Sequence, residues 1–392
     1  MKWFYRTISE TILNQVNSRP VLLLTGIRQS GKSALLQKLF PDARYITFDH
    51  YQNSETALNN PSAFLNSFTE ERIILDEVQY VPELFRELKI IIDKDRVIPA
   101  RWILTGSQKF VLLESARESL AGRISLLELN TMGTNELRDY FKPDNIQEIL
   151  WKGGFPETWA IPGINIQLYL DDYITTYLEK DLRSIIQTPN LRDFHRFLRA
   201  CAVRTGALVN FTEMARDTGI SPNTAKSWLN TLVRSGIITL LEPWFRNISK
   251  RLTKTPKLYF NDQGLLCRLL NIENIDQLSA NHHSGAVWEN FVFNELIRIY
   301  GISSERNLFF YRDHNQVEVD FLIEKTEEVI LIEAKFAERP GRTNIKKAAA
   351  SIGTADFKGI CTCRVPEKGV FQTETSVMIN PLLEPLSGII SL

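Results

Sequence analysis

Residues 26–33 form a glycine-rich loop that ends in a lysine and a hydroxyl side chain, with the spacing G-x-x-x-x-G-K-S. The backbone N–H groups of such a loop surround phosphates, because the glycines allow a tight turn before a helix. We expect Lys32 to reach the β- and γ-phosphates of a nucleotide and Ser33 to bind Mg²⁺. The predicted nucleotide-binding residues are Gly26, Ile27, Arg28, Gln29, Ser30, Gly31, Lys32 and Ser33. This pattern predicts a site for ATP and Mg²⁺.

Two acidic residues follow the apolar run Ile73–Leu75, which has the length and composition of a buried strand. We expect Asp76 to hold Mg²⁺ through water and to belong to the nucleotide site. Glu77 would polarise the water that attacks the γ-phosphate, a role that needs a carboxylate at this place. Taken alone, such a pair would more simply cap a helix or face solvent. Together with the glycine-rich loop it favours ATP hydrolysis.

A third strand-like run, Trp102–Thr105, is followed by Gly106, Ser107 and Gln108. Ligands bind at the carboxyl ends of strands in open α/β sheets, so Ser107 or Gln108 would sense the γ-phosphate; a plain turn is the alternative. Arg123 is a candidate arginine finger that acts on the site of a neighbouring subunit. A surface salt bridge is the alternative for this arginine.

A second group of charged residues lies in two strand-like runs near the end of the chain, Val317–Ile323 and Val329–Lys335. Alternation along a strand places Glu333 and Lys335 on one face, and a hairpin would bring Asp320 beside them. Charges among apolar strand residues are costly unless they bind a metal or pair with one another. We therefore expect either a metal held by Asp320 and Glu333 or a closed network of ion pairs.

The stretch 191–260 carries 12 Lys or Arg against 4 Asp or Glu, a net charge of +8 within a chain of zero net charge. Its helix, turn, helix and apolar run have the order of a winged helix-turn-helix. Four basic residues of the wing are candidates for contacts with nucleic-acid phosphates: Lys250, Arg251, Lys254 and Lys257. A lid or a protein interface is the alternative function for this segment.

Outside these motifs, the pattern of apolar residues indicates how the chain is organised. Residues 1–18 contain an amphipathic helix, and strands then alternate with helices up to residue 129, which indicates a parallel α/β sheet. Residues 134–190 are predicted to be helical, and a further α/β unit begins near residue 261. The predicted domains are residues 1–145, 146–190, 191–260 and 261–392.

The composition is that of an ordinary globular protein. The 392 residues include 46 basic and 46 acidic side chains, and 44% are hydrophobic. No apolar run is long enough to span a membrane, the N-terminus lacks the pattern of a signal peptide, and four irregularly spaced cysteines do not make a disulfide framework. We expect a cytoplasmic protein with reduced thiols.

Taken together, the motifs resemble the widespread prokaryotic AAA-type P-loop ATPases that carry a C-terminal DUF4143 region. The segments that carry the resemblance are Gly26–Ser33, Ile73–Glu77, Leu104–Ser107, Ala121–Arg123 and Gly153–Glu157. The resemblance covers nearly the whole chain. It implies a Mg²⁺-dependent ATPase that works in an assembly, with ATP, DNA and further copies of the chain as the expected partners.

The carboxylates near the C-terminus resemble the core of PD-(D/E)XK nucleases. In that core two acids, here Asp320 and Glu333, hold Mg²⁺, and a lysine, here Lys335, helps to orient or deprotonate the attacking water. Such a core also takes a glutamate from a preceding helix. Glu289 is the best match, and Glu295 is the competitor.

The predicted fold is therefore an α/β protein with three parts: a P-loop AAA-type parallel sheet, a winged helix-turn-helix, and a C-terminal α/β domain like that of restriction endonucleases. The predicted function is ATP hydrolysis coupled to DNA binding and to DNA cleavage. The alternative is a regulatory ATPase switch whose nuclease-like domain is inactive and docks protein partners. Stimulation of ATP turnover by DNA would distinguish the two.

Overall fold

The computed structural model describes residues 4–94, 99–143, 145–178, 191–246, 255–301, 307–326, 328–366, 371–372 and 376–390. The chain divides into two compact units, Met1–Thr131 with Arg234–Gly236, and Met132–Val233 with Ile237–Leu392. The first unit thus ends directly after its last strand, whereas the sequence pattern predicts the end of the first domain at residue 145. In the described part of the chain, no helix has the length and apolar character needed to cross a membrane.

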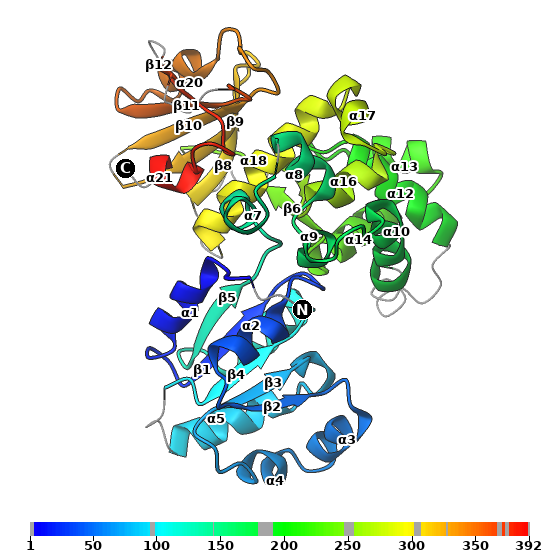
Figure 1. Ribbon diagram of the computed structural model, residues 1–392, viewed down its shortest axis with the longest axis vertical. Coiled ribbons are helices and arrows are strands. Elements are labelled where there is room, and N and C mark those ends of the chain that lie inside the picture. The colour runs from blue at the N-terminus through cyan, green and yellow to red at the C-terminus, as the bar shows by residue number, and fades with distance from the viewer. Residues whose placement is uncertain are drawn as a thin grey trace. The chain divides into compact units, whose positions relative to one another are not determined.

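The first unit is built on a five-stranded parallel sheet in the order β2-β3-β4-β1-β5 (Figure 1). Its strands are β1 (Val21–Thr25), β2 (Arg44–Thr47), β3 (Ile73–Asp76), β4 (Trp102–Thr105) and β5 (Ile124–Glu128). β1 lies between β4 and β5, and all five of its residues are buried. A continuous apolar strand is expected here, because helices cover both faces of a parallel sheet. The predicted parallel α/β sheet is present.

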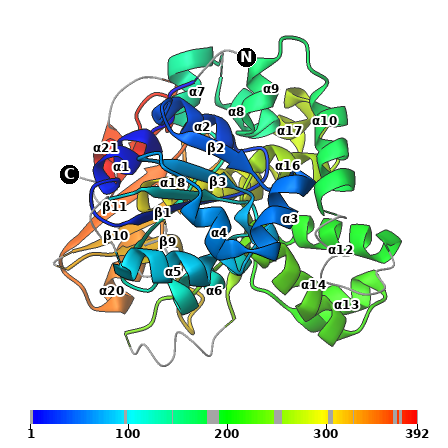
Figure 2. The same cartoon turned by 90° about the horizontal axis from the view of Figure 1, so that it is seen from below.

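Successive side chains of β1 enter different cores on the two faces of this sheet. Leu22 and Leu24 pack with the core that includes Ile12 and Leu35, while Val21 and Leu23 pack in the other. Figure 2 shows α1 and α2 on one face and α5 and α6 on the other. The helices of this unit are α1 (Ile8–Gln15), α2 (Lys32–Leu39), α3 (Tyr51–Asn59), α4 (Pro61–Asn66), the 3₁₀ turn η1 (Val78–Tyr80), α5 (Leu84–Lys94) and α6 (Lys109–Ser119).

The second unit begins with short helices, as the sequence predicts for the segment after residue 134. They are α7 (Thr134–Phe141), α8 (Ile146–Lys152), α9 (Pro156–Ala160), α10 (Ile166–Tyr173) and the π-helical turn η2 (Ile174–Leu178). The turn after α8 is tied to a distant part of the chain. The buried carboxylate of Asp262 accepts the N–H of Gly154 at 2.8 Å and also caps α16 (Gln263–Leu269). Gly153 has φ +74°, and a methyl group there would overlap this carboxylate, so glycine is required.

Three helices and a two-stranded antiparallel sheet follow. The elements are α12 (Leu191–Val203), α13 (Phe211–Thr218), α14 (Pro222–Arg234), β6 (Ile238–Leu241) and β7 (Lys257–Phe260). Asn210 caps α13 by accepting two backbone N–H groups, and Gly219 ends it at φ +76°. The indole of Trp228 on α14 packs edge-on against Phe194 and Phe197 of α12. The order of helix, turn, helix and strand is the one that the sequence indicates.

The remainder of the second unit surrounds a six-stranded mixed sheet in the order β12-β13-β11-β10-β9-β8 (Figure 1). Its strands are β8 (Leu308–Arg312), β9 (Glu318–Glu324), β10 (Val329–Ala334), β11 (Phe357–Thr362), β12 (Phe371–Gln372) and β13 (Val377–Ile379). Its helices, besides α16, are α17 (Ile275–Ala280), α18 (Ser284–Tyr300), α20 (Ile345–Ile352) and α21 (Leu386–Ile390). β9 and β10 form the antiparallel hairpin that the sequence predicts.

Candidate nucleotide site and carboxylate cluster

The glycine-rich loop connects β1 to α2 and has positive φ angles at three of its residues. Gly26 has φ +145°, and a methyl group there would overlap the carbonyl oxygen of Leu129. Gly31, at φ +92°, is the N-cap residue of α2. Gln29 between them also has a left-handed backbone, with φ +59°. The loop therefore ends at a helix N-terminus, whose free N–H groups favour an anion.

Lys32, the first residue of α2, is a buried charged residue at the end of this loop. It is 5% exposed, and its Nζ donates to the carbonyl oxygens of Gly26 at 2.9 Å and Ile27 at 3.0 Å. Burial lowers the pKa of Lys32 from 10.5 to about 8, and the charges of Glu77 and Asp76 oppose the change. A buried ammonium that has only neutral acceptors in direct contact fits a binding site for phosphates.

Asp76 at the end of β3 lies beside the hydroxyl of Ser33, as a shared metal site requires. Burial raises the pKa of Asp76, and hydrogen bonds from Tyr45 and Ser33 oppose the rise. The hydroxyl of Tyr45, on the neighbouring strand β2, donates to Asp76 Oδ2 at 2.5 Å. A hydroxyl and a carboxylate are ligands that Mg²⁺ accepts together with nucleotide phosphates. The sequence pattern does not indicate Tyr45, because its contact with Asp76 depends on β2 lying next to β3.

Glu77 is held in a fixed position by two side chains. Its backbone is left-handed, with φ +56°, and its Oε2 accepts a hydrogen bond from the amide of Gln79. The hydroxyl of Ser107, which follows β4, lies 3.3 Å from the same oxygen. Gly106 leaves room for Gln79, because a methyl group at Gly106 would overlap the Gln79 amide oxygen. Gln108, the other candidate for sensing the γ-phosphate, is the N-cap residue of α6.

Arg123 makes an ion pair on its own subunit. Its guanidinium donates to both carboxylate oxygens of Asp93, at 2.7 and 2.8 Å, and to the carbonyl oxygen of Ala121 at 2.9 Å. This is the surface salt bridge that the sequence left open as the alternative. A role as a finger for a neighbouring subunit stays a prediction, and it would require Arg123 to leave Asp93.

In the second unit, the β9–β10 hairpin brings Asp320, Glu333 and Lys335 together. Lys335 Nζ lies 3.0 Å from Glu333 Oε2, and the other Glu333 oxygen accepts the N–H of Asn344. Asp320 Oδ2 accepts the N–H of Ala334 at 2.8 Å. Burial and the charge of Glu289 raise the pKa of Asp320 to about 7, while Lys257 and Lys335 oppose the rise. The predicted convergence is present, and its carboxylates already accept hydrogen bonds.

Glu289, and not Glu295, is the helical glutamate at this cluster. Glu289 Oε1 accepts a hydrogen bond of 2.6 Å from the hydroxyl of Tyr259. Glu295 pairs instead with Arg298 at 2.9 Å and accepts the N–H of Thr134 at 3.1 Å. Both glutamates are on α18, and they serve different neighbours.

The expectation that Lys257 contacts phosphates from the wing is wrong. Lys257 is the first residue of β7, is 2% exposed, and pairs with Glu289 at 3.2 Å and Glu318 at 2.6 Å. Burial opposes its charge, but Glu289, Asp320 and Glu318 raise the pKa of Lys257 above its usual value. All four residues of β7 are buried, and the acids Glu289 and Glu318 hold the lysine inside the protein. The other three predicted wing contacts, Lys250, Arg251 and Lys254, lie outside the described residues.

The two groups of acids differ in how well they fit a metal. Ser33 and Asp76 fit Mg²⁺ that also binds a nucleotide, since they adjoin the phosphate loop. Over the described part of the chain, no three His, Cys, Asp or Glu side chains are grouped so as to hold a metal ion. The carboxylates of the second unit accept N–H groups and ammonium groups instead. This arrangement does not fit the Mg²⁺ site that the nuclease resemblance implies for Asp320 and Glu333.

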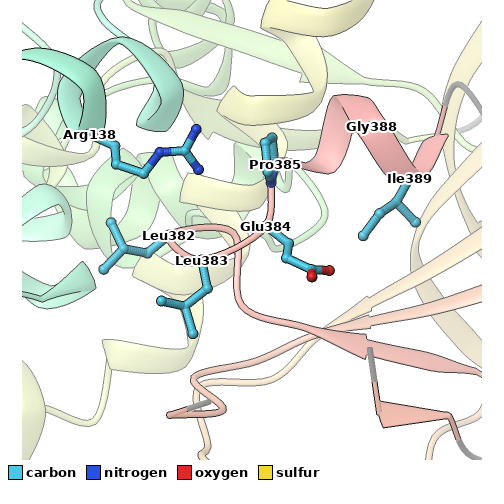
Figure 3. Close-up of a pocket in the computed structure, with 7 residues that line it drawn as sticks. All are labelled: Arg138, Leu382, Leu383, Glu384, Pro385, Gly388 and Ile389. Atoms are coloured by element: carbon cyan, nitrogen blue, oxygen red, sulfur yellow. The ribbon is translucent and has the colours of Figure 1, made fainter. Parts of the chain in front are cut away.

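A pocket of about 570 Å³ lies elsewhere in the second unit (Figure 3). Its lining residues are Arg138, Leu382, Leu383, Glu384, Pro385, Gly388 and Ile389. None of the site residues that the sequence indicates is among them. We therefore assign the pocket no part in the chemistry of either site.

Three family models match the chain in succession. Residues 18–138 match an AAA domain, residues 143–276 match a domain of unknown function (DUF8612), and residues 284–378 match a domain of unknown function (DUF4143). An uncharacterized protein of Mycobacterium bovis and one of Mycobacterium tuberculosis are each 31% identical over 347 residues, which are 88% of this chain and 76% of the relative. Among solved structures, a Walker-type ATPase of Pyrococcus abyssi covers 68% of this chain and 96% of its own, with 16% identity and a TM-score of 0.48.

Proposed function

The chain belongs to the family of the two mycobacterial proteins, and from this premise we propose that it is a Mg²⁺-dependent ATPase whose ATP hydrolysis is coupled to DNA binding. Its first unit is an AAA-type P-loop ATPase domain. One observation carries the proposal of hydrolysis beyond nucleotide binding. The carboxylate of Glu77 is held by Gln79 and Ser107 at the edge of the sheet where β3 and β4 end, next to the phosphate loop.

The residues of this edge divide the work of hydrolysis. Lys32 and the loop N–H groups bind the phosphates, and Ser33 and Asp76 would hold Mg²⁺. When bound, this cation would supply positive charge to neutralise the phosphate oxygens. Glu77 orients the attacking water and accepts its proton. Because Gln79 and Ser107 fix one oxygen of Glu77, the second oxygen remains for the water.

For DNA, we propose the segment from α12 to β7 as a winged helix. Two features support this function: its helix, turn, helix and two-strand order, and its net charge of +8. On α14, Asn223, Lys226 and Asn230 are exposed while the opposite face packs on α12. A polar helix with one lysine suits contacts with the phosphate backbone better than reading of bases. We therefore expect binding with little sequence preference.

The rate of ATP hydrolysis with and without duplex DNA tests the proposal. We expect Mg²⁺-dependent turnover that DNA stimulates, with Glu77→Gln as the control that removes turnover and keeps nucleotide binding. If DNA does not change the rate of ATP hydrolysis, the chain is an ATPase whose partner is not DNA. No turnover with Mg²⁺ and DNA present would contradict the proposal.

A second candidate concerns the C-terminal part and is favoured by the ion pairs of Lys257. Here the domain has a nuclease-like fold but docks a partner and does not cut, so the chain is a regulatory ATPase switch. Cleavage of plasmid and linear DNA with Mg²⁺ or Mn²⁺ distinguishes the two candidates. Cutting that Asp320→Ala and Lys335→Ala abolish, with ATP hydrolysis preserved, would establish the nuclease and exclude the docking domain.

A further inference from the structure

Four charged side chains from three elements lie close together at strand β9 of the C-terminal sheet. Lys257 comes from β7, Glu289 comes from α18, and Glu318 and Asp320 come from β9. The two β9 acids are two residues apart and so lie on the same face of the strand. The Lys257 ammonium contacts Glu289 and Glu318 directly, and Asp320 is near enough for each charge to act on the other. The lysine thus shares one cluster with all three acids.

The lysine of this cluster is buried and the acids it contacts are partly buried, so their charges must balance locally. The side chain of Lys257 is 3% exposed, and those of Glu289 and Glu318 are 17% and 29% exposed. An unpaired charge at this depth would be far more costly than one at the surface. Lys257 thus supplies the positive charge that balances the negative charges of Glu289 and Glu318.

The remaining donors around the cluster are weaker or peripheral. Tyr259 donates a hydroxyl to Glu289, and the backbone of Ala334 donates an N–H to Asp320. Arg312 lies 3.5 Å from the outer oxygen of Glu318 and is itself 39% exposed. Lys335 pairs with Glu333, and its charge also acts on Asp320. The ammonium of Lys257 is therefore the buried cation that directly bridges Glu289 and Glu318.

We propose that Lys257 is the resident cation of this carboxylate cluster, and that its ammonium excludes divalent metal ions from Glu289, Glu318 and Asp320. The inference deepens the docking-domain candidate, on which it rests, by giving the physical reason for a nuclease-like fold without its metal. The lysine belongs to β7, so the same ion pairs also join the proposed winged helix to the C-terminal sheet.

Replacing Lys257 with Met keeps most of the side-chain volume and removes the charge. Glu289 and Glu318 then have no ammonium in contact with them, and carboxylate oxygens are the ligands that Mn²⁺ and Mg²⁺ accept. With the lysine present the three acids are not grouped so as to hold a metal ion, so binding requires them to close around the space that the ammonium leaves. We expect Lys257→Met to gain one Mn²⁺ per chain, and Lys257→Arg, which keeps the charge, to gain none. The Mn²⁺ should also raise the melting temperature of Lys257→Met more than that of the parent.

The experiment uses the full chain without nucleotide, in an Asp76→Asn background that suppresses the P-loop metal site. Bound Mn²⁺ is counted from the loss of the free-ion electron paramagnetic resonance signal. Adding Asp320→Asn should abolish the site gained by Lys257→Met. The proposal is overturned if the parent binds Mn²⁺ in an Asp320-dependent manner, or if Lys257→Met folds and gains no site.

A folding failure of Lys257→Met would still be informative. The triple change Lys257→Met, Glu289→Gln and Glu318→Gln removes the cation together with both contacting charges. If the lysine acts as the counter-ion of the acids, this neutral variant folds where the single change does not. Failure of the triple change as well would overturn the proposal. DNA cleavage is measured separately, so an inactive domain that gains no Mn²⁺ would keep the docking candidate and reject the role of Lys257.

Discussion

Replacing Lys32 with Met should stabilise the nucleotide-free first unit while removing its ability to bind ATP. Burial lowers the pKa of Lys32 from 10.5 to about 8, which corresponds to about 3 kcal/mol against the charged form. The two hydrogen bonds to the carbonyl oxygens of Gly26 and Ile27 stabilise the folded state by about 1 kcal/mol each. The difference leaves a net cost of about 1 kcal/mol for the lysine, which methionine of similar length would remove.

The assay follows unfolding by calorimetry, and the transition that ADP shifts in the wild type identifies the first unit. At pH 7 we expect this transition to move up in Lys32→Met and to stop responding to ADP. Lys32→Arg is the control, because its charge cannot be lost on burial. A decrease of about 1 kcal/mol or more in the free energy of unfolding of Lys32→Met would refute the reasoning. The two hydrogen bonds to carbonyl oxygens would then outweigh the cost of burying the charge.

The pH dependence supplies an independent check on the same residue. Below pH 8 Lys32 is protonated in the folded and the unfolded chain, so the whole cost of burial is present. Between about pH 8 and 10.5 the unfolded chain holds more protons, so the wild type gains stability relative to Lys32→Met as pH rises. Nucleotide phosphates favour the charged lysine, so ADP affinity should fall above pH 8, with proton uptake measurable by calorimetry in different buffers.

Three further predictions concern hydrolysis and DNA. Glu77→Gln should keep ATP binding and lose turnover, because an amide cannot accept the proton of the attacking water; a wild-type rate would assign that water to another residue. If Arg123 serves a neighbouring subunit, Arg123→Ala should lose turnover at unchanged nucleotide affinity, and mixing it with a chain lacking the P-loop lysine should restore part of it; a monomer with normal turnover would rule this out. Neutralising Lys250, Arg251 and Lys254 together should flatten the salt dependence of DNA binding by about three phosphate contacts, and an unchanged slope would place DNA elsewhere.

The nucleotide site was predictable where its parts are neighbours in the chain. The loop, Lys32 and Ser33 are one continuous segment, and Asp76 and Glu77 end one apolar strand. Tyr45 could not be found in this way, because its contact with Asp76 depends on β2 lying next to β3. A strand order with crossovers is set by packing of the whole sheet, which local patterns do not contain.

Lys257 shows a different limit of sequence analysis. It follows a run of basic residues and resembles a member of that run, although it begins the apolar strand Lys257–Phe260. Alternation along a strand says which residues share a face, but it does not say which face is buried. Only the acids of α18 and β9 decide that the lysine points inward. The carboxylate hairpin was easier to predict, because β9 and β10 follow one another closely in the chain and pair antiparallel.

The carboxylate of Asp262 also bears on the order in which the chain folds. Its cap on α16 uses N–H groups two and three residues away, whereas its bond to Gly154 closes a loop of 108 residues. Loop closure costs entropy, so the long-range bond should form late, after the local cap. Interactions made after the transition state act mainly on the unfolding rate. A methyl group at Gly153 should therefore shorten the lifetime of the native second unit while leaving its refolding rate nearly unchanged.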